Sequence, residues 1–194
     1  TRRITKNGKK EELVVSRIFP TTHFGFRKIT VERPLRLNFQ ASPERNARLE
    51  EERGLQALAQ SRKKGAAGAK EQALGRALQE AIRALVRGLP NGVFRDRSEF
   101  ERVLDSATGA AGLRLPVPAR KAILSALSER DETASVCRGK DGNPEPDSEL
   151  RDTESVPLPA GEDPADANGV PESVSTFFER EVRPHVPDAW IDMA

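Results

Sequence analysis

Alternating apolar positions near the start of the chain are typical of β-strands. Residues 13–19 are rich in β-branched side chains, and residues 26–37 place Ile29 and Val31 two positions apart, with Pro20 and Gly25 in the break between the two runs. This pattern predicts an antiparallel hairpin. Because an isolated hairpin is marginal in water, we expect it to form the edge of a larger sheet, although no other segment of the chain predicts a strand.

Helical periodicity begins after the hairpin. Ser42 is a suitable cap, Pro43 suits a first helical position, and a charged stretch containing leucines continues to about residue 61. The glycines and alanines of residues 63–70 then predict a flexible break. The clearest amphipathic helix follows and is expected to end at Gly88 and Pro90. Its apolar stripe has three- and four-residue steps and consists of Leu74, Leu78, Ile82, Leu85 and Leu89.

Three shorter helices are also predicted. One begins at Ser98, which forms a capping-box pattern with Glu101. Another extends from about Pro118 to Arg130. The last covers residues 173–182 near the end of the chain.

Charge divides the chain into three parts, although the formal net charge is only +2. Residues 1–40 carry 10 Lys and Arg against 3 Asp and Glu, and residues 41–130 carry 17 against 11. Residues 131–194 carry 5 against 16, together with 8 of the 14 prolines. This asymmetry predicts a basic part that faces a polyanion and an extended, Pro-rich acidic tail.

Composition restricts the class of protein. The 194 residues contain no apolar run of the ~20 residues that a membrane helix needs and no secretory signal at the start, so we expect a cytoplasmic protein. A single cysteine, Cys137, excludes an intrachain disulfide, and two distant histidines cannot supply a structural zinc site. A start at Thr1 without methionine suggests a piece of a longer protein.

Several motifs fail when their spacing is compared with the chemistry they need. The glycines at residues 65–70 are too close for a phosphate-binding loop, and Glu71 follows the lysine where that motif requires serine or threonine. Residues 141–152 alternate oxygen ligands as a calcium loop does, but Pro146 occupies the position that needs glycine. Residues 143–146 lack the second adjacent proline and the ring with which adenine methyltransferases hold a flipped base. The sequence therefore predicts no catalytic, cofactor-binding or metal-binding residue.

The basic hairpin offers candidate DNA contacts. Its cations alternate with phenylalanines and are Arg17, Arg27, Lys28, Arg33 and Arg36. One interpretation is contact with phosphates. In the other, the phenylalanines fill the core of the sheet while the cations lie in water or pair with acidic residues such as Glu32.

Large aromatic side chains in the acidic tail suggest that it is anchored. Phe177, Phe178 and Trp190 favour burial in a segment otherwise too polar to form a core. We expect these three side chains to hold the tail as a strap across the basic part of the protein, with its carboxylates near Arg and Lys of the first 130 residues.

Three blocks of sequence carry a resemblance to a known family. They are residues 24–39 (FGFRKITVERPLRLNF), residues 121–158 (which include ALSERDETASVCRGKDGNPEPDSELRDTESVPL) and residues 178–192 (FEREVRPHVPDAWID). In this order they resemble the C-terminal third of the modification subunit of type I restriction-modification systems. The helices between the blocks match in character but contain no diagnostic motif.

The resemblance implies a parent enzyme that transfers a methyl group from S-adenosylmethionine to adenine N6 in DNA. It implies partners as well: a specificity subunit that reads the DNA and a restriction subunit that cleaves it. The family's catalytic and cofactor motifs lie upstream of the matched region, so this segment is expected to bind no cofactor.

The expected fold is an α+β fragment with three parts. Residues 1–40 would be the terminal hairpin of a Rossmann-like methyltransferase sheet, residues 41–130 a mainly helical region, and residues 131–194 the extended acidic tail. The alternative function is a free-standing, non-enzymatic module that binds nucleic acid or protein.

Overall fold

The computed structural model describes residues 2–6, 9–13, 18–19 and 21–192, and it is an α+β fold with small antiparallel sheets and several helices. The chain divides into two compact units, and neither coincides with the three ranges expected from the sequence. The sheet unit consists of Thr1–Arg33 together with Asp147–Ala194, and the helical unit consists of Pro34–Pro146.

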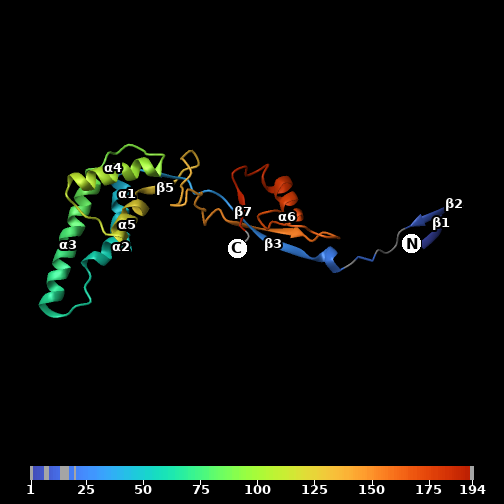
Figure 1. Cartoon of the computed structure of the whole chain (residues 1–194), viewed down its shortest axis with the longest axis horizontal. Coiled ribbons are helices and arrows are strands. Elements are labelled where there is room, and N and C mark those ends of the chain that lie inside the picture. The colour runs from blue at the N-terminus through green and yellow to red at the C-terminus, as the bar shows by residue number, and fades with distance from the viewer. Residues whose placement is uncertain (1, 7–8, 14–17, 20, 193–194) are drawn as a thin grey trace. The chain divides into compact units, whose positions relative to one another are not determined.

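The centre of the sheet unit is an antiparallel sheet in the order β6-β3-β7 (Figure 1). Strand β3 (Phe26–Glu32) pairs with β6 (Asp152–Pro157) from Phe26 to Val31. Along its other edge it pairs with β7 (Trp190–Asp192), but only from Thr30 to Glu32. Both neighbours of β3 therefore come from the segment expected to be an extended tail.

The predicted hairpin is wrong in its pairing. Strand β3 forms where expected, but its partners are β6 and β7, and Ile18 and Phe19 lie outside any strand. Residues 14–17 of the other predicted strand are outside the described residues. A separate hairpin joins β1 (Arg2–Lys6) to β2 (Lys9–Leu13). Strand β6 escaped prediction because Val156 is its only apolar residue apart from the terminal proline, so alternation is not visible.

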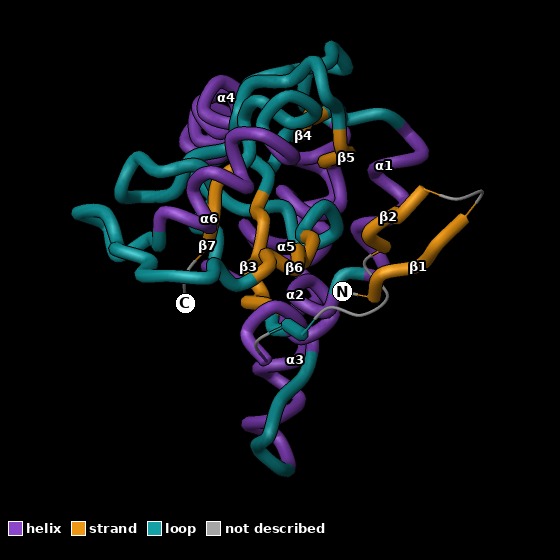
Figure 2. Tube along the Cα trace, turned by 90° about the vertical axis from the view of Figure 1, so that its right-hand side faces the viewer, coloured by secondary structure: helices purple, strands orange, loops and turns teal. Residues whose placement is uncertain are grey.

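One face of the central sheet is covered by the helix predicted at residues 173–182, which is confirmed. It consists of α6 (Glu172–Phe177) and a π-helical segment, η4 (Phe178–Val182), and Figure 2 shows it beside the strands. The buried side chains between helix and sheet are Ile29, Val31, Val156, Val174, Phe178, Val182 and Ala189. The expectation of an extended tail is therefore wrong for residues 147–192, which complete a core.

The helical unit contains the predicted amphipathic helix as α3 (Gly65–Arg87). Helices α4 (Arg97–Ala110) and α5 (Val117–Leu127) pack with it around a core that includes Phe39, Ile82, Phe100 and Ile123. The remaining elements are α1 (Pro43–Arg48), η2 (Leu49–Glu51), α2 (Arg53–Gln56), η3 (Ala57–Ala59) and a short sheet of β4 (Leu37–Phe39) with β5 (Ser128–Arg130).

Helix caps agree only in part with the sequence patterns. The Ser42 hydroxyl accepts a hydrogen bond from the Arg45 amide, as predicted. Helix α4 is instead capped by Asp96, whose carboxylate accepts from the Glu99 amide at 3.0 Å, so the predicted cap at Ser98 is wrong. Asp and Ser are both favoured caps, and Asp96 comes first along the chain.

The predicted flexible break at residues 63–70 is also wrong. Gly65 begins α3, and Gly68 and Gly75 lie on its buried side. A Cβ atom at Gly68 would approach the Lys63 carbonyl oxygen to 2.1 Å, and one at Gly75 would approach the Leu58 carbonyl oxygen to 1.8 Å. Glycine here permits the segment before α3 to lie directly against the helix, which is the opposite of a flexible linker.

Candidate functional site

The candidate DNA contacts do not form one free cationic surface. Arg27 pairs with Asp163, and Arg36 donates to the Ala134 carbonyl oxygen at 2.9 Å. The Nε atom of Arg33 is buried without a hydrogen-bond acceptor. Lys28 is exposed and has no ionic partner among the described residues, whereas Arg17 lies outside them.

Arg27, Asp163 and Ser173 form a polar cluster in the sheet unit. Arg27 donates from Nη1 to Oδ2 of Asp163 at 2.8 Å, and Ser173 donates to the same carboxylate from its amide at 2.9 Å and from its hydroxyl at 2.7 Å. The pKa of Asp163 is lowered, first by the hydrogen bond from the Ser173 amide and next by the one from Arg27. The cluster therefore joins β3, the loop before α6 and the first turn of α6.

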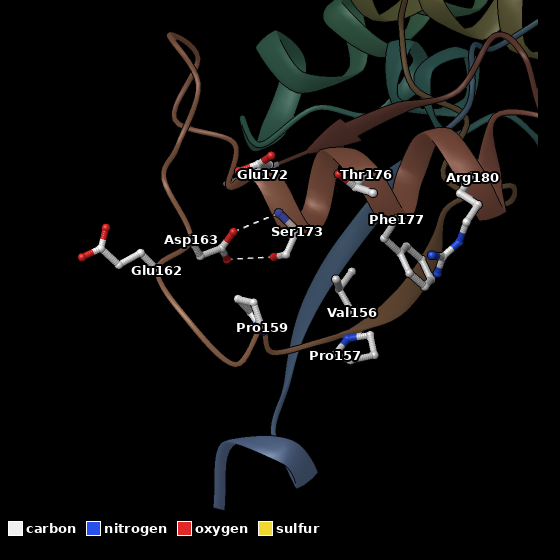
Figure 3. Close-up of a pocket in the computed structure, with 10 residues that line it drawn as sticks. All are labelled: Val156, Pro157, Pro159, Glu162, Asp163, Glu172, Ser173, Thr176, Phe177 and Arg180. Atoms are coloured by element: carbon white, nitrogen blue, oxygen red, sulfur yellow. Dashed lines mark hydrogen bonds between the residues drawn. The ribbon is translucent and has the colours of Figure 1, made fainter. Parts of the chain in front are cut away.

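A cavity of about 340 Å³ opens beside this cluster (Figure 3). Val156, Pro157, Pro159 and Phe177 give it an apolar lining, while Glu162, Glu172 and Arg180 are charged residues of its wall. The hydroxyl of Ser173 is donated to Asp163, and no histidine lines the cavity. The serine therefore has no neighbouring base that would make it a nucleophile.

A second cavity of the sheet unit, of about 280 Å³, brings His185 and Arg33 together with carboxylates. Its lining consists of Val31, Arg33, Leu150, Asp152, Glu154, Glu181, Val182, His185 and Val186. Nevertheless, no group of three or more metal-ligating side chains occurs in the part of the chain that the structure describes.

Cys137 lies in the helical unit and is buried, with 2% of its surface exposed. Burial is the largest influence on its thiol and raises its pKa, against a smaller opposing effect of Arg97. Arg97 forms two 2.8 Å hydrogen bonds with the Glu145 carboxylate. A thiol that is buried and reluctant to ionise is a structural group rather than a nucleophile.

The three predicted tail anchors differ in burial. Phe178 is 3% exposed and belongs to the core against β3, whereas Phe177 and Trp190 are half-buried. The guanidinium of Arg183 lies 5.6 Å from the centre of the Phe178 ring, within the range of a cation–π contact.

Sequence reasoning missed a buried charge, Glu32. Its side chain is 2% exposed, and its Oε1 atom accepts a hydrogen bond from Arg151 at 2.6 Å. Its Oε2 atom is buried and has no partner. No local signal indicates this pair, because the two residues are 119 positions apart.

No family model, curated protein or solved structure matches the chain. Within the described residues, no helix is both long and apolar enough to cross a membrane.

Proposed function

We propose that the chain is the C-terminal part of the modification subunit of a type I restriction-modification system. In this proposal the parent is an adenine-N6 DNA methyltransferase that uses S-adenosylmethionine. The segment itself is structural and contacts the specificity and restriction subunits.

One observation carries the proposal. The three sequence blocks that resemble the family each supply one strand of the same sheet: residues 24–39 contain β3, residues 121–158 contain β6 and residues 178–192 contain β7. Strand β3 is more than 100 residues from β6 and β7 in the sequence, and segments that meet in one sheet have a shared structural reason to be similar together. A chance resemblance in three separate places would have no such reason.

The unpaired edge of β3 is consistent with a larger sheet in the parent. Strand β7 covers only Thr30 to Glu32, which leaves the Phe26 end of that edge without a neighbouring strand among the described residues. The side chains of Phe24 and Phe26 are 71% and 56% exposed. We infer that the Rossmann-like sheet of the catalytic region covers this edge and these rings, because unpaired strand edges and exposed apolar surface favour association.

The genomic reading frame tests the proposal. Codons upstream of Thr1, in the same frame, for an Asn-Pro-Pro-Phe motif and a glycine loop would support it. The full-length product, expressed with the neighbouring specificity subunit, should then transfer a labelled methyl group to adenine N6. The 194-residue chain alone, as a control, should transfer none and should show no cofactor binding by calorimetry.

The second candidate is a non-enzymatic module that binds nucleic acid or protein, and the exposed Phe24 and Phe26 rings favour it equally. A start codon directly before Thr1 would support this candidate and contradict the methyltransferase proposal.

A further inference from the structure

Two of the places where an asparagine is followed directly by a glycine lie in exposed loops. Asn91 and Gly92 lie between α3 and α4 (Figure 1), and Asn168 and Gly169 lie in the loop before α6. A third such step, residues 7–8, is outside the described residues. The pattern matters chemically because glycine has no Cβ atom to shield its amide nitrogen from the asparagine side chain.

The amide of Gly169 is engaged in a turn. It donates a hydrogen bond to the Asp166 carbonyl oxygen at 3.0 Å, and the amide of Asn168 donates to the Asp166 carboxylate at 2.8 Å. Gly169 has a φ of 81°, in the left-handed region that suits a turn. Its nitrogen must therefore leave a formed hydrogen bond before it can react with the neighbouring side chain.

The amide of Gly92, in contrast, donates no hydrogen bond to any described residue. The Asn91 side chain is held only by Gln40, whose Nε2 atom donates to Asn91 Oδ1 at 3.4 Å and to the Asn91 carbonyl oxygen at 3.1 Å. A hydrogen bond of 3.4 Å is long and restrains the side chain little. Apart from its chain neighbours, no described residue lies within 4 Å of the position that a Cβ atom would take at Gly92. The two reacting groups therefore have room to meet.

The related Asp-Gly step in the helical unit is closed in the same way as Gly169. The amide of Gly142 donates to the Gly139 carbonyl oxygen at 3.1 Å. The Asp141 carboxylate accepts two hydrogen bonds from Asn143, one from its amide and one from its side chain. Among the described steps of both kinds, only the one at Asn91 combines an unbonded glycine amide with a loosely held side chain.

We propose that Asn91 is a site of spontaneous deamidation that the fold leaves open, whereas the fold protects Asn168. The Gly92 nitrogen loses its proton and bonds to Cγ of Asn91, the Cγ–Nδ2 bond breaks, and ammonia leaves with that proton. Water then opens the five-membered succinimide at either of its two carbonyl carbons, which gives aspartate or isoaspartate. Water is the only other reactant, and the inference does not depend on the methyltransferase proposal.

The modification acts on a loop that is tied to the core of the helical unit. Phe94 exchanges two backbone hydrogen bonds with Phe39, at 2.8 and 2.9 Å. Isoaspartate leads the backbone through its β-carbon and so lengthens the preceding loop by one atom. Either product also places a negative charge beside the Gln40 side chain. Deamidation therefore changes both the charge and the length of this loop without an enzyme.

The test is incubation of the full 194-residue chain under native conditions, with samples taken over time for trypsin digestion and mass spectrometry. Cleavage after Lys and Arg separates the three Asn-Gly steps into the peptides 7–9, 88–95 and 152–180. We expect peptide 88–95 to gain the mass that replaces an amide by a carboxylic acid and to split into two isomers. The rate should rise with pH, because the Gly92 nitrogen must lose its proton. It should exceed the rate of peptide 152–180 at least about fivefold, the factor that corresponds to one ordinary hydrogen bond.

Two controls separate the fold from the local sequence. In guanidinium chloride, where the turn at Gly169 is lost, the two peptides should convert at similar rates. Gly92→Ala should slow the conversion of Asn91 at least ~10-fold, because a methyl group shields the nitrogen, and the open space at this position allows the variant to fold. Gly109→Ala, at another glycine with open space around it, should leave the rate unchanged.

Three outcomes would overturn the proposal. They are equal rates of Asn91 and Asn168 in the native chain, aspartate as the sole product at Asn91, and a rate difference that persists in guanidinium chloride. Failure of the reading-frame test would leave these results unaffected.

Discussion

Arg27 and Asp163 lie 136 positions apart in the sequence, yet their side chains meet at 2.8 Å between Nη1 and Oδ2. This ion pair links the central strand of the sheet unit to the loop before α6. A residue that the sequence indicates as a DNA contact is thereby used to hold the acidic segment in place.

The first prediction concerns the pH dependence of this link. Because the pKa of Asp163 is lower in the folded protein than its ordinary value of about 3.9, its contribution to stability is present above that value and is lost as the pH falls through the folded-state pKa. Asp163→Asn should lower the urea midpoint at pH 7, and the difference from the parent chain should shrink below pH 4. Trp190 is the only tryptophan, so its fluorescence reports on this unit.

Glu162→Gln is the control for this prediction, since Glu162 is exposed and has no ionic partner among the described residues. It should leave the midpoint unchanged. An equal effect of Asp163→Asn at pH 7 and pH 2.5 would mean that the charge of Asp163 does not contribute.

The second prediction compares the buried tail anchor Phe178 with Phe26, an exposed ring on β3. Phe178→Ala should destabilise the sheet unit by ~3–5 kcal/mol, because Phe178 is buried against β3. Phe26→Ala, at a position 56% exposed, should cost less than about 1 kcal/mol. Urea unfolding followed by Trp190 fluorescence measures both. Similar costs for the two variants would show that Phe178 does not hold the tail in solution.

The third prediction concerns the close approach at Gly75. A methyl group would lie 1.8 Å from the Leu58 carbonyl oxygen, so Gly75→Ala should destabilise the helical unit by roughly 1–3 kcal/mol. In α4, Gly109 has open space around its Cβ position, and Gly109→Ala should stabilise by about 0.5–1 kcal/mol. Thermal unfolding followed by helical circular dichroism should show shifts of opposite sign. A stabilising effect at both positions would exclude the close packing.

The fourth prediction concerns Cys137. Burial and a raised pKa should make its thiol react at least ~10-fold more slowly with an aromatic disulfide reagent in the native chain than in denaturing urea at the same pH. The release of the coloured thiolate follows the reaction. Equal rates in the two conditions would place the thiol at the surface.

Apolar periodicity along the sequence was sufficient to predict the elements whose own apolar residues form one buried face. Leu78, Ile82 and Leu85 specify α3, although Leu74 at the start of the predicted stripe is 64% exposed. Ile29 and Val31 specify β3, because each pattern requires one buried face whatever covers it. The sequence also predicted the short helix near Phe178.

Only the tertiary structure decided the partners. The pattern of β3 is the same whether residues 13–19 or residues 152–157 lie beside it, since a strand's hydrogen-bonding groups are identical along every edge. For the same reason the sequence could not show that Arg27 is paired, that Glu32 is buried or that Gly75 lies against Leu58. The sequence by itself determined that α3 and β3 each have one apolar face that packs away from water. The long-range pairings determined which charged side chains are engaged within the protein. A side chain that already forms an ion pair with a distant residue of the same chain is not available to bind another molecule.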